Sequence, residues 1–140
     1  MAIETTTHLN FRGNARAALS FYQHVFGGEL VVATYADVGN PDPAIADLIT
    51  WGQVKSAEGF HVMAYDVQPE RPFDPGENAV FVSVRGTSPE EIRGYWDKLA
   101  DGAITLFDLA PAAWSPLYGM LKDRFGVNWV LDVAVPYPAG

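Results

Sequence analysis

Residues 11–22, Phe-Arg-Gly-Asn-Ala-Arg-Ala-Ala-Leu-Ser-Phe-Tyr, share a pattern with residues 84–95, Val-Arg-Gly-Thr-Ser-Pro-Glu-Glu-Ile-Arg-Gly-Tyr. In each stretch a strand end leads through Arg-Gly into a helix start, and a tyrosine lies nine residues after the glycine. The arginines, Arg12 and Arg85, are about 73 residues apart, which is far longer than the repeat of a solenoid protein. The pattern therefore predicts two like-folded halves that share one core, with a binding site where they meet.

The first half, residues 1–67, reads as one helix among strands. Strands are expected at residues 6–12, 29–35, 47–55 and 59–67, where apolar residues alternate or β-branched residues gather. The helix is expected at residues 15–26, because apolar side chains recur there at helical spacing. Asn14 is its expected N-cap and Gly27–Gly28 its end.

The second half, residues 78–140, repeats this order after a linker at residues 68–77, which contains three prolines and one glycine. Ser88, Pro89 and Glu91 form a capping box with proline at the first helical position, and Gly102 ends the helix. Strands are expected at residues 78–85, 103–108, 116–122 and 126–133. Each half is therefore a β-α-β-β-β module.

Composition limits the functions open to the chain. Its 140 residues are 49% apolar and 13% aromatic, enough for a sizeable core in one domain or two fused half-domains. A net charge of −8 argues against nucleic-acid binding, which needs a basic face. Without cysteine, a secretory leader or a long apolar run, we expect a cytoplasmic protein with no membrane segment.

Strand alternation sorts the side chains by sheet face. One face is apolar and expected to lie under the helices, with Phe60, Val62, Ala64, Val80, Val82, Val84, Val127, Trp129 and Leu131. The other is mixed, with His61, Met63, Tyr65, Ala79, Phe81, Ser83, Arg85, Asn128, Val130 and Asp132. A mixed face of this kind is typical of a small-molecule cleft, and the alternative is that its polar groups only face solvent.

Several motifs resemble one superfamily. They are His8-Leu9-Asn10-Phe11-Arg12-Gly13-Asn14, Phe21-Tyr22, residues 59–64, 82–84 and 114–119, and Asp123-Arg124-Phe125-Gly126-Val127-Asn128-Trp129. Together they resemble the PhnB-like branch of the vicinal-oxygen-chelate superfamily, which includes glyoxalase I, bleomycin-resistance proteins and extradiol dioxygenases. The resemblance implies an α+β fold of two β-α-β-β-β modules forming a cupped mixed sheet with helices on the outer face, in a homodimer.

The resemblance also implies four metal-ligand positions, which this chain fills poorly. They fall at His8, Met63, Ala79 or Phe81, and Val130. The residues at three of these four positions cannot bind a divalent metal, so we expect no metal and no cofactor. The alternative is a rearranged site built from His8, His61 and Asp132.

The residues expected to bind a ligand are polar or aromatic side chains of the mixed face and its rim. They are His8, Asn10, Arg12, Trp51, His61, Met63, Tyr65, Phe81, Ser83, Trp114, Tyr118 and Asn128. Arg12 and Arg85 either grip an anionic ligand or bond to carbonyls and to Asp66 or Asp132. His24 is expected on the surface, Trp96 and Trp129 in the core, and Trp114 at the cavity edge.

The leading hypothesis is a metal-independent protein that binds a small organic ligand, with no catalytic residue. The second is a metal-dependent lyase, isomerase or dioxygenase with a rearranged site around His8. The third is a regulatory or partner-binding module with a vestigial cleft. Relatives of this branch are sometimes labelled ubiquinone-pathway methyltransferases, but the chain has no strand, Gly-rich loop and helix for a methyl donor, so we do not expect that activity.

Overall fold

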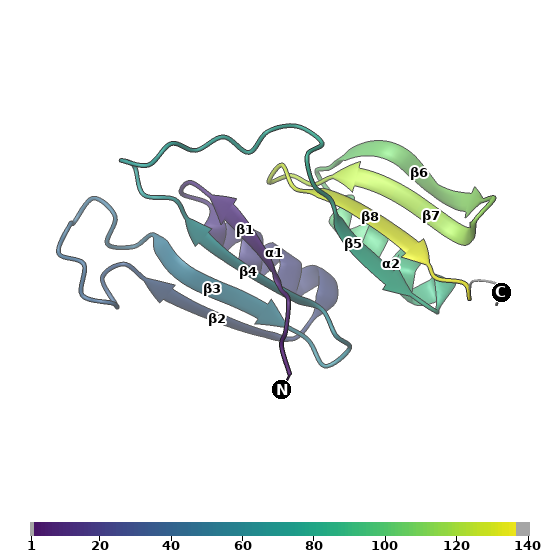
Figure 1. Ribbon diagram of the computed structural model, residues 1–140, viewed down its shortest axis with the longest axis horizontal. Coiled ribbons are helices and arrows are strands. Elements are labelled where there is room, and N and C mark those ends of the chain that lie inside the picture. The colour runs from purple at the N-terminus through teal and green to yellow at the C-terminus, as the bar shows by residue number, and fades with distance from the viewer. Residues whose placement is uncertain (1, 137–140) are drawn as a thin grey trace. The chain divides into compact units, whose positions relative to one another are not determined.

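The chain forms two compact units with the same order of elements. The computed structural model describes residues 2–136. Unit 1 extends to Pro75 and unit 2 begins at Gly76. Each contains a four-stranded sheet and one helix in the order β-α-β-β-β (Figure 1). This topology confirms the α+β prediction.

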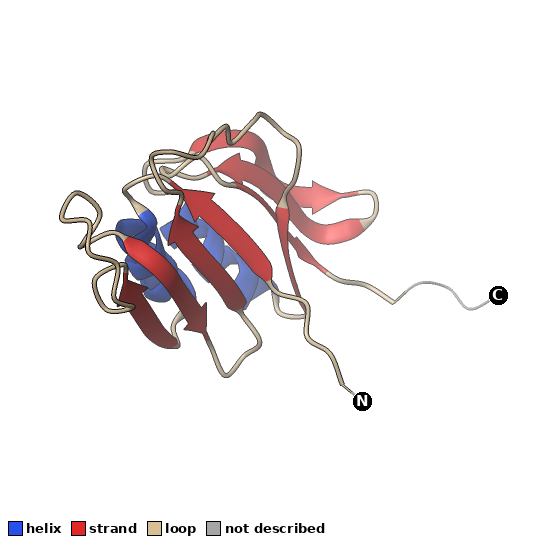
Figure 2. Cartoon of the chain, turned by 60° about the vertical axis from the view of Figure 1, so that its left-hand side comes forward, coloured by secondary structure: helices blue, strands red, loops and turns tan. Residues whose placement is uncertain are grey.

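Unit 1 consists of β1 (Thr7–Phe11), α1 (Ala15–Phe26), β2 (Glu29–Thr34), β3 (Ile49–Lys55) and β4 (His61–Asp66). The strand order is β1-β4-β3-β2, and only β1 and β4 are parallel. Helix α1 covers one face of this sheet (Figure 2) and buries Leu19, Tyr22 and Phe26 against it. Gly52 permits the close approach, because a Cβ at this position would lie 2.5 Å from Leu19 Cδ1.

Unit 2 consists of β5 (Val82–Gly86), α2 (Pro89–Leu99), β6 (Ile104–Ala112), β7 (Ser115–Lys122) and β8 (Asn128–Val133). The strand order is β5-β8-β7-β6, with β5 and β8 parallel. Helix α2 packs on β5 and β8 through Ile92, Trp96 and Leu99. Its predicted cap is confirmed, since the Glu91 amide donates to Ser88 Oγ at 3.2 Å.

Two local predictions are wrong. The strand expected from residue 78 begins at Val82, and Val80 is 79% exposed instead of packed under the helix. Asn14 makes no side-chain cap. The Asp66 carboxylate occupies that place instead, because Oδ1 accepts from the amides of Gly13 at 2.7 Å and Ala15 at 3.0 Å.

The two units repeat in a different register from the one the Arg-Gly pairs predict. The equivalent strand-end contacts are Val67 N to Phe11 O and Ala134 N to Gly86 O, so Phe11 corresponds to Gly86. The turn into the helix is one residue shorter in unit 2, since residues 12–14 correspond to residues 87–88. Arg12 therefore follows its strand, whereas Arg85 lies inside one.

No helix within residues 2–136 is long and apolar enough to cross a bilayer.

Candidate functional site

The sheet of unit 1 has a helix-free face that brings together most of the predicted residues of the first half. In β4, the side chains of His61, Met63 and Tyr65 are half-buried, while Val62 and Ala64 between them are buried. Strand pairing sets further residues beside these, with His8 opposite Met63, Asn10 opposite Tyr65 and Gln53 opposite Met63. We call the first face the set His8, Asn10, Trp51, Gln53, His61, Met63 and Tyr65.

His61 is held at both ring nitrogens. Nε2 lies 2.9 Å from Gln53 Oε1, and Nδ1 lies 3.1 Å from Thr6 Oγ1. An amide oxygen only accepts, so Nε2 carries the hydrogen, and in the neutral ring Nδ1 accepts from the Thr6 hydroxyl. These contacts fix the orientation of the imidazole on the first face.

His8 is oriented by its neighbours on the same face. Its Nδ1 lies 2.9 Å from Asn10 Oδ1, which leaves Nε2 as the acceptor of the neutral ring. Its ring meets the Tyr65 ring edge-on, with centroids 5.4 Å apart. The first face therefore offers an aromatic wall with hydrogen-bonding groups at fixed positions, which suits recognition of a small polar organic molecule.

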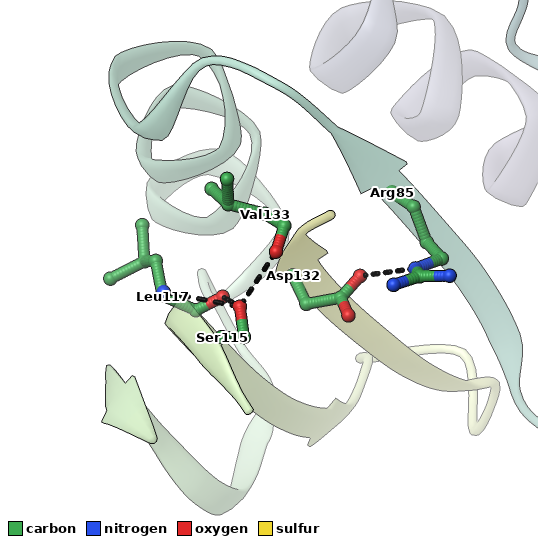
Figure 3. A network of polar contacts seen from close by, with 5 residues as sticks. All are labelled: Arg85, Ser115, Leu117, Asp132 and Val133. Carbon is green, nitrogen blue, oxygen red and sulfur yellow. Dashed lines mark hydrogen bonds and ion pairs between the residues drawn. The ribbon is translucent and has the colours of Figure 1, made fainter. Parts of the chain in front are cut away.

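Both predicted arginines are already engaged with protein groups. Arg12 Nη2 donates to the carbonyls of Gln68, at 3.4 Å, and Arg71, and its guanidinium lies 5.4 Å from the centre of the Phe73 ring. Arg85 Nε donates to Asp132 Oδ1 at 3.1 Å (Figure 3). Of the two alternatives for these side chains, the structure has the contacts with carbonyls and with Asp132.

The helix-free face of unit 2 holds the remaining predicted residues. Ser83 of β5 pairs with Val130 of β8, and Tyr118 of β7 pairs with Asp132. Trp114 lies in the turn before β7, is 62% exposed and meets the Tyr118 ring edge-on at 5.1 Å. Phe81 precedes β5 and is half-buried, while Asn128 is buried at the start of β8.

The four metal positions that the resemblance implies do not fit a divalent metal. Strand pairing places His8 beside Met63 and, equivalently, Ser83 beside Val130, so Ser83 replaces Ala79 or Phe81 at the third position. In the alternative trio, His61 is hydrogen-bonded at both ring nitrogens and Asp132 is ion-paired with Arg85. Among residues 2–136, no group of three or more His, Cys, Asp or Glu residues is placed to hold a metal ion.

The sequence did not predict two residues of the site, Gln53 and Thr6. Gln53 lies on the same side of β3 as Trp51, a placement that strand alternation alone indicates. Thr6, which precedes β1, reaches His61 through a contact between residues 55 positions apart, so no local pattern indicates it. His24 on α1 is exposed, as expected, and Trp96 and Trp129 lie in the core.

Comparison with known proteins gives the chain its family. The family model described as 3-demethylubiquinone-9 3-methyltransferase matches residues 3–131. The chain belongs to this family. The chain is also similar to a solved structure of the putative 3-demethylubiquinone-9 3-methyltransferase, PhnB protein, from Bacillus cereus. That structure is 29% identical, with 94% of this chain and 100% of that one covered and a TM-score of 0.73.

Other solved structures are also similar to this member of the 3-demethylubiquinone-9 3-methyltransferase family. Protein PA1353 from Pseudomonas aeruginosa is 29% identical, with 95% and 98% of the two chains covered and a TM-score of 0.86. A glyoxalase-related enzyme from Fulvimarina pelagi shares the fold at 16% identity, with 99% and 94% covered and a TM-score of 0.64. Among curated proteins, none matches the chain. The family match and the fold shared with the glyoxalase-related enzyme agree with the two-module fold that the resemblance implies.

Proposed function

We propose that the chain is a small-molecule-binding protein of the glyoxalase/bleomycin-resistance type, which holds an organic ligand without a metal. The observation that carries the proposal is the first face, where His8 and His61 are fixed by hydrogen bonds beside half-buried Tyr65, Met63 and Trp51. Polar groups at fixed positions among aromatic side chains are the usual lining of a small-molecule site. Arg12, which follows β1, is a further proposed ligand contact in unit 1, and the predicted residues of unit 2 are proposed as ligand contacts on that unit's own sheet.

The activity in the family's name is not part of the proposal. A cofactor phosphate or carboxylate would use free amides at a strand-to-helix turn. In unit 1 the amides of Gly13 and Ala15 already donate to Asp66, and in unit 2 the amide of Glu91 donates to Ser88. Neither turn has a Gly-rich loop, so we propose binding and no catalytic residue.

The test measures ligand binding with and without metal. Untagged protein is treated with a chelator and titrated with a panel of aromatic and amphipathic compounds, with tryptophan fluorescence and the melting temperature as readouts. We expect at least one compound to bind the metal-free protein, and His8→Ala to weaken it about fivefold, the effect of one lost hydrogen bond. His24→Ala is the matched control, because His24 is an exposed histidine outside the first face.

The alternative has its own signature. Stoichiometric zinc, nickel, manganese or iron that is lost in His8→Ala would contradict metal-free binding. It would favour a lyase, isomerase or dioxygenase with ligands around His8. A protein that binds neither metal nor any compound, but retains a protein partner, would favour a regulatory module.

We also propose that the chain is a cytoplasmic homodimer. The support for a dimer is the set of large apolar side chains exposed on β6, namely Ile104, Leu106 and Phe107. Fractionation with antibody detection tests the location, and sedimentation velocity tests the assembly.

A further inference from the structure

Asn128 leaves a buried acceptor without a hydrogen bond. The residue is 9% exposed, and its Oδ1 has no partner within residues 2–136. Its Nδ2 makes one long contact, 3.5 Å from Asn78 Oδ1. Buried polar atoms are almost always hydrogen-bonded, so an unpaired buried amide oxygen indicates that a group outside the chain completes it.

The backbone next to Asn128 is arranged to keep Asn78 beside it. Asn78 has a φ of 54°, the only positive value at a non-glycine residue in the part of the chain that the structure describes. Asparagine tolerates this conformation better than most residues. The result is two amide oxygens near each other, one buried on Asn128 and one exposed on Asn78, and both can only accept.

We infer that the Asn78 and Asn128 side chains form an acceptor site for an O–H or N–H group of an uncharged organic ligand. This inference rests on the proposed function and specifies the chemical class of the ligand. It concerns the end of unit 2 where β8 begins, and it adds Asn78, which strand alternation does not single out.

The surrounding charges favour an uncharged donor over an ion. Lys122 of β7 pairs directly with Asn128 and so lies on the same face, where it disfavours a ligand cation. Further along that face, Arg85 is already ion-paired with Asp132 at 3.1 Å. A carboxylate would bring two more acceptors to Asn128 Oδ1, which needs a donor. A hydroxyl or amide N–H carries no positive charge, needs no contact with Arg85 and donates a hydrogen to Asn128 Oδ1.

The experiment compares probes that differ only in their donor. Benzamide and phenol carry an N–H or O–H group, whereas methyl benzoate and anisole are matched in size and have none. Each is titrated at millimolar concentration into the full chain, and the side-chain amide signals of Asn128 and Asn78 are followed by NMR. We expect benzamide or phenol to shift both signals, and the acceptor-only probes to bind about fivefold more weakly.

Two variants separate binding from folding. Asn128→Leu removes the unpaired acceptor at nearly constant volume, so we expect the melting temperature to rise by about 4 °C while donor-probe binding is lost. Asn128→Asp keeps an acceptor in the same place and should retain the binding of the donor probes. A fall in the melting temperature of Asn128→Leu with unchanged probe binding would mean that the oxygen is paired within the protein, and would overturn the inference.

The remaining outcomes are also decisive. If the acceptor-only probes bind as well as the donors, the assignment of the ligand class is wrong. If the donor probes shift only first-face residues such as His61 and Trp51, this inference fails and the proposed function stands. If no probe shifts either face, a water molecule completes Asn128, and both the inference and the proposed binding of small aromatic ligands fail.

Discussion

Asp66 connects several separate segments of unit 1. It is 1% exposed, and its carboxylate accepts from three backbone amides, those of Gly13, Ala15 and Ile49, at 2.7 to 3.0 Å. Its own carbonyl accepts from the Tyr35 hydroxyl at 2.7 Å. One aspartate at the end of β4 thus holds the start of α1 and the start of β3.

We predict that Asp66→Asn destabilises the chain by about 3 kcal/mol, because buried charge-assisted hydrogen bonds contribute strongly and the new amide hydrogens would face amide donors. Urea denaturation followed by circular dichroism measures the loss. Asp37→Asn is the control, since the exposed Asp37 carboxylate accepts from the Thr34 amide within its own turn, at 2.9 Å. Equal losses in the two variants would show that Asp66 is not the connecting residue.

Tyr35 makes the stability of unit 1 sensitive to alkaline pH. Burial raises the pKa of its phenol above the usual 10.0, the nearby Tyr65 and Asp66 add to the effect, and a hydrogen bond with Thr50 opposes it. Between the unfolded and the folded pKa, the folded chain keeps a proton that the unfolded chain releases. The unfolding free energy therefore falls as the pH rises above about 10.

Thermal unfolding from pH 8 to pH 11 tests this on wild type and Tyr35→Phe. At pH 8 we expect the variant to be less stable by about 1 kcal/mol, because it lacks the hydrogen bond to the Asp66 carbonyl. Above pH 10 the wild type should lose stability more steeply and the gap should narrow. If the stabilities of wild type and Tyr35→Phe changed in parallel with pH, the phenol would have the same pKa in the folded and the unfolded chain.

The two strand-to-helix junctions use different residues to accept hydrogen bonds from the first amides of their helices. Both helices begin with unpaired amides that need acceptors. In unit 2 the Ser88 hydroxyl supplies one from within the local sequence, whereas in unit 1 the Asp66 carboxylate supplies it from 51 positions beyond Ala15. The capping box of α2 is visible in the sequence for this reason, and the cap of α1 is not.

We predict unequal losses of stability for two cap substitutions that look alike in the sequence. Ser88→Ala should cost about 1 kcal/mol, since it removes the hydrogen bond from the Glu91 amide. Asn14→Ala should cost much less, since the Asn14 side chain makes no cap. Chemical denaturation of the two variants measures the difference, and a larger loss in Asn14→Ala would contradict the role of Asp66.

At the scale of the whole molecule, the sequence predicts on which face of a sheet a side chain lies better than it predicts the hydrogen-bonding partners of that side chain. Alternation correctly separated His61, Met63 and Tyr65 from Val62 and Ala64, because the side-chain period of a strand is fixed by its geometry. It did not reveal that Gln53 and Thr6 hold His61, since those contacts depend on sheet register. The sequence aligns the two halves on their Arg-Gly pairs, whereas hydrogen bonding aligns Phe11 with Gly86.

Strand β6 lies at the edge of its sheet and, among the residues that the structure describes, pairs with β7 alone. This nine-residue strand has one charged residue, Asp108, and exposes Phe107 at 62% and Ile104 at 64%. A long edge strand rich in apolar residues attracts another strand, and its single charge limits the repulsion that a net charge of −8 creates between copies.

We therefore expect wild type to sediment as a dimer and Phe107→Lys as a monomer, because a lysine at the edge opposes strand pairing. Val38→Lys is the matched control, since Val38 is 63% exposed in a loop of unit 1 and should leave the dimer intact. If Phe107→Lys remains dimeric while circular dichroism shows it folded, another surface joins the copies. If wild type sediments as a monomer, the prediction of a dimer is wrong. The chain would then bind its ligand with the residues of one copy, and β6 would be exposed for a different partner.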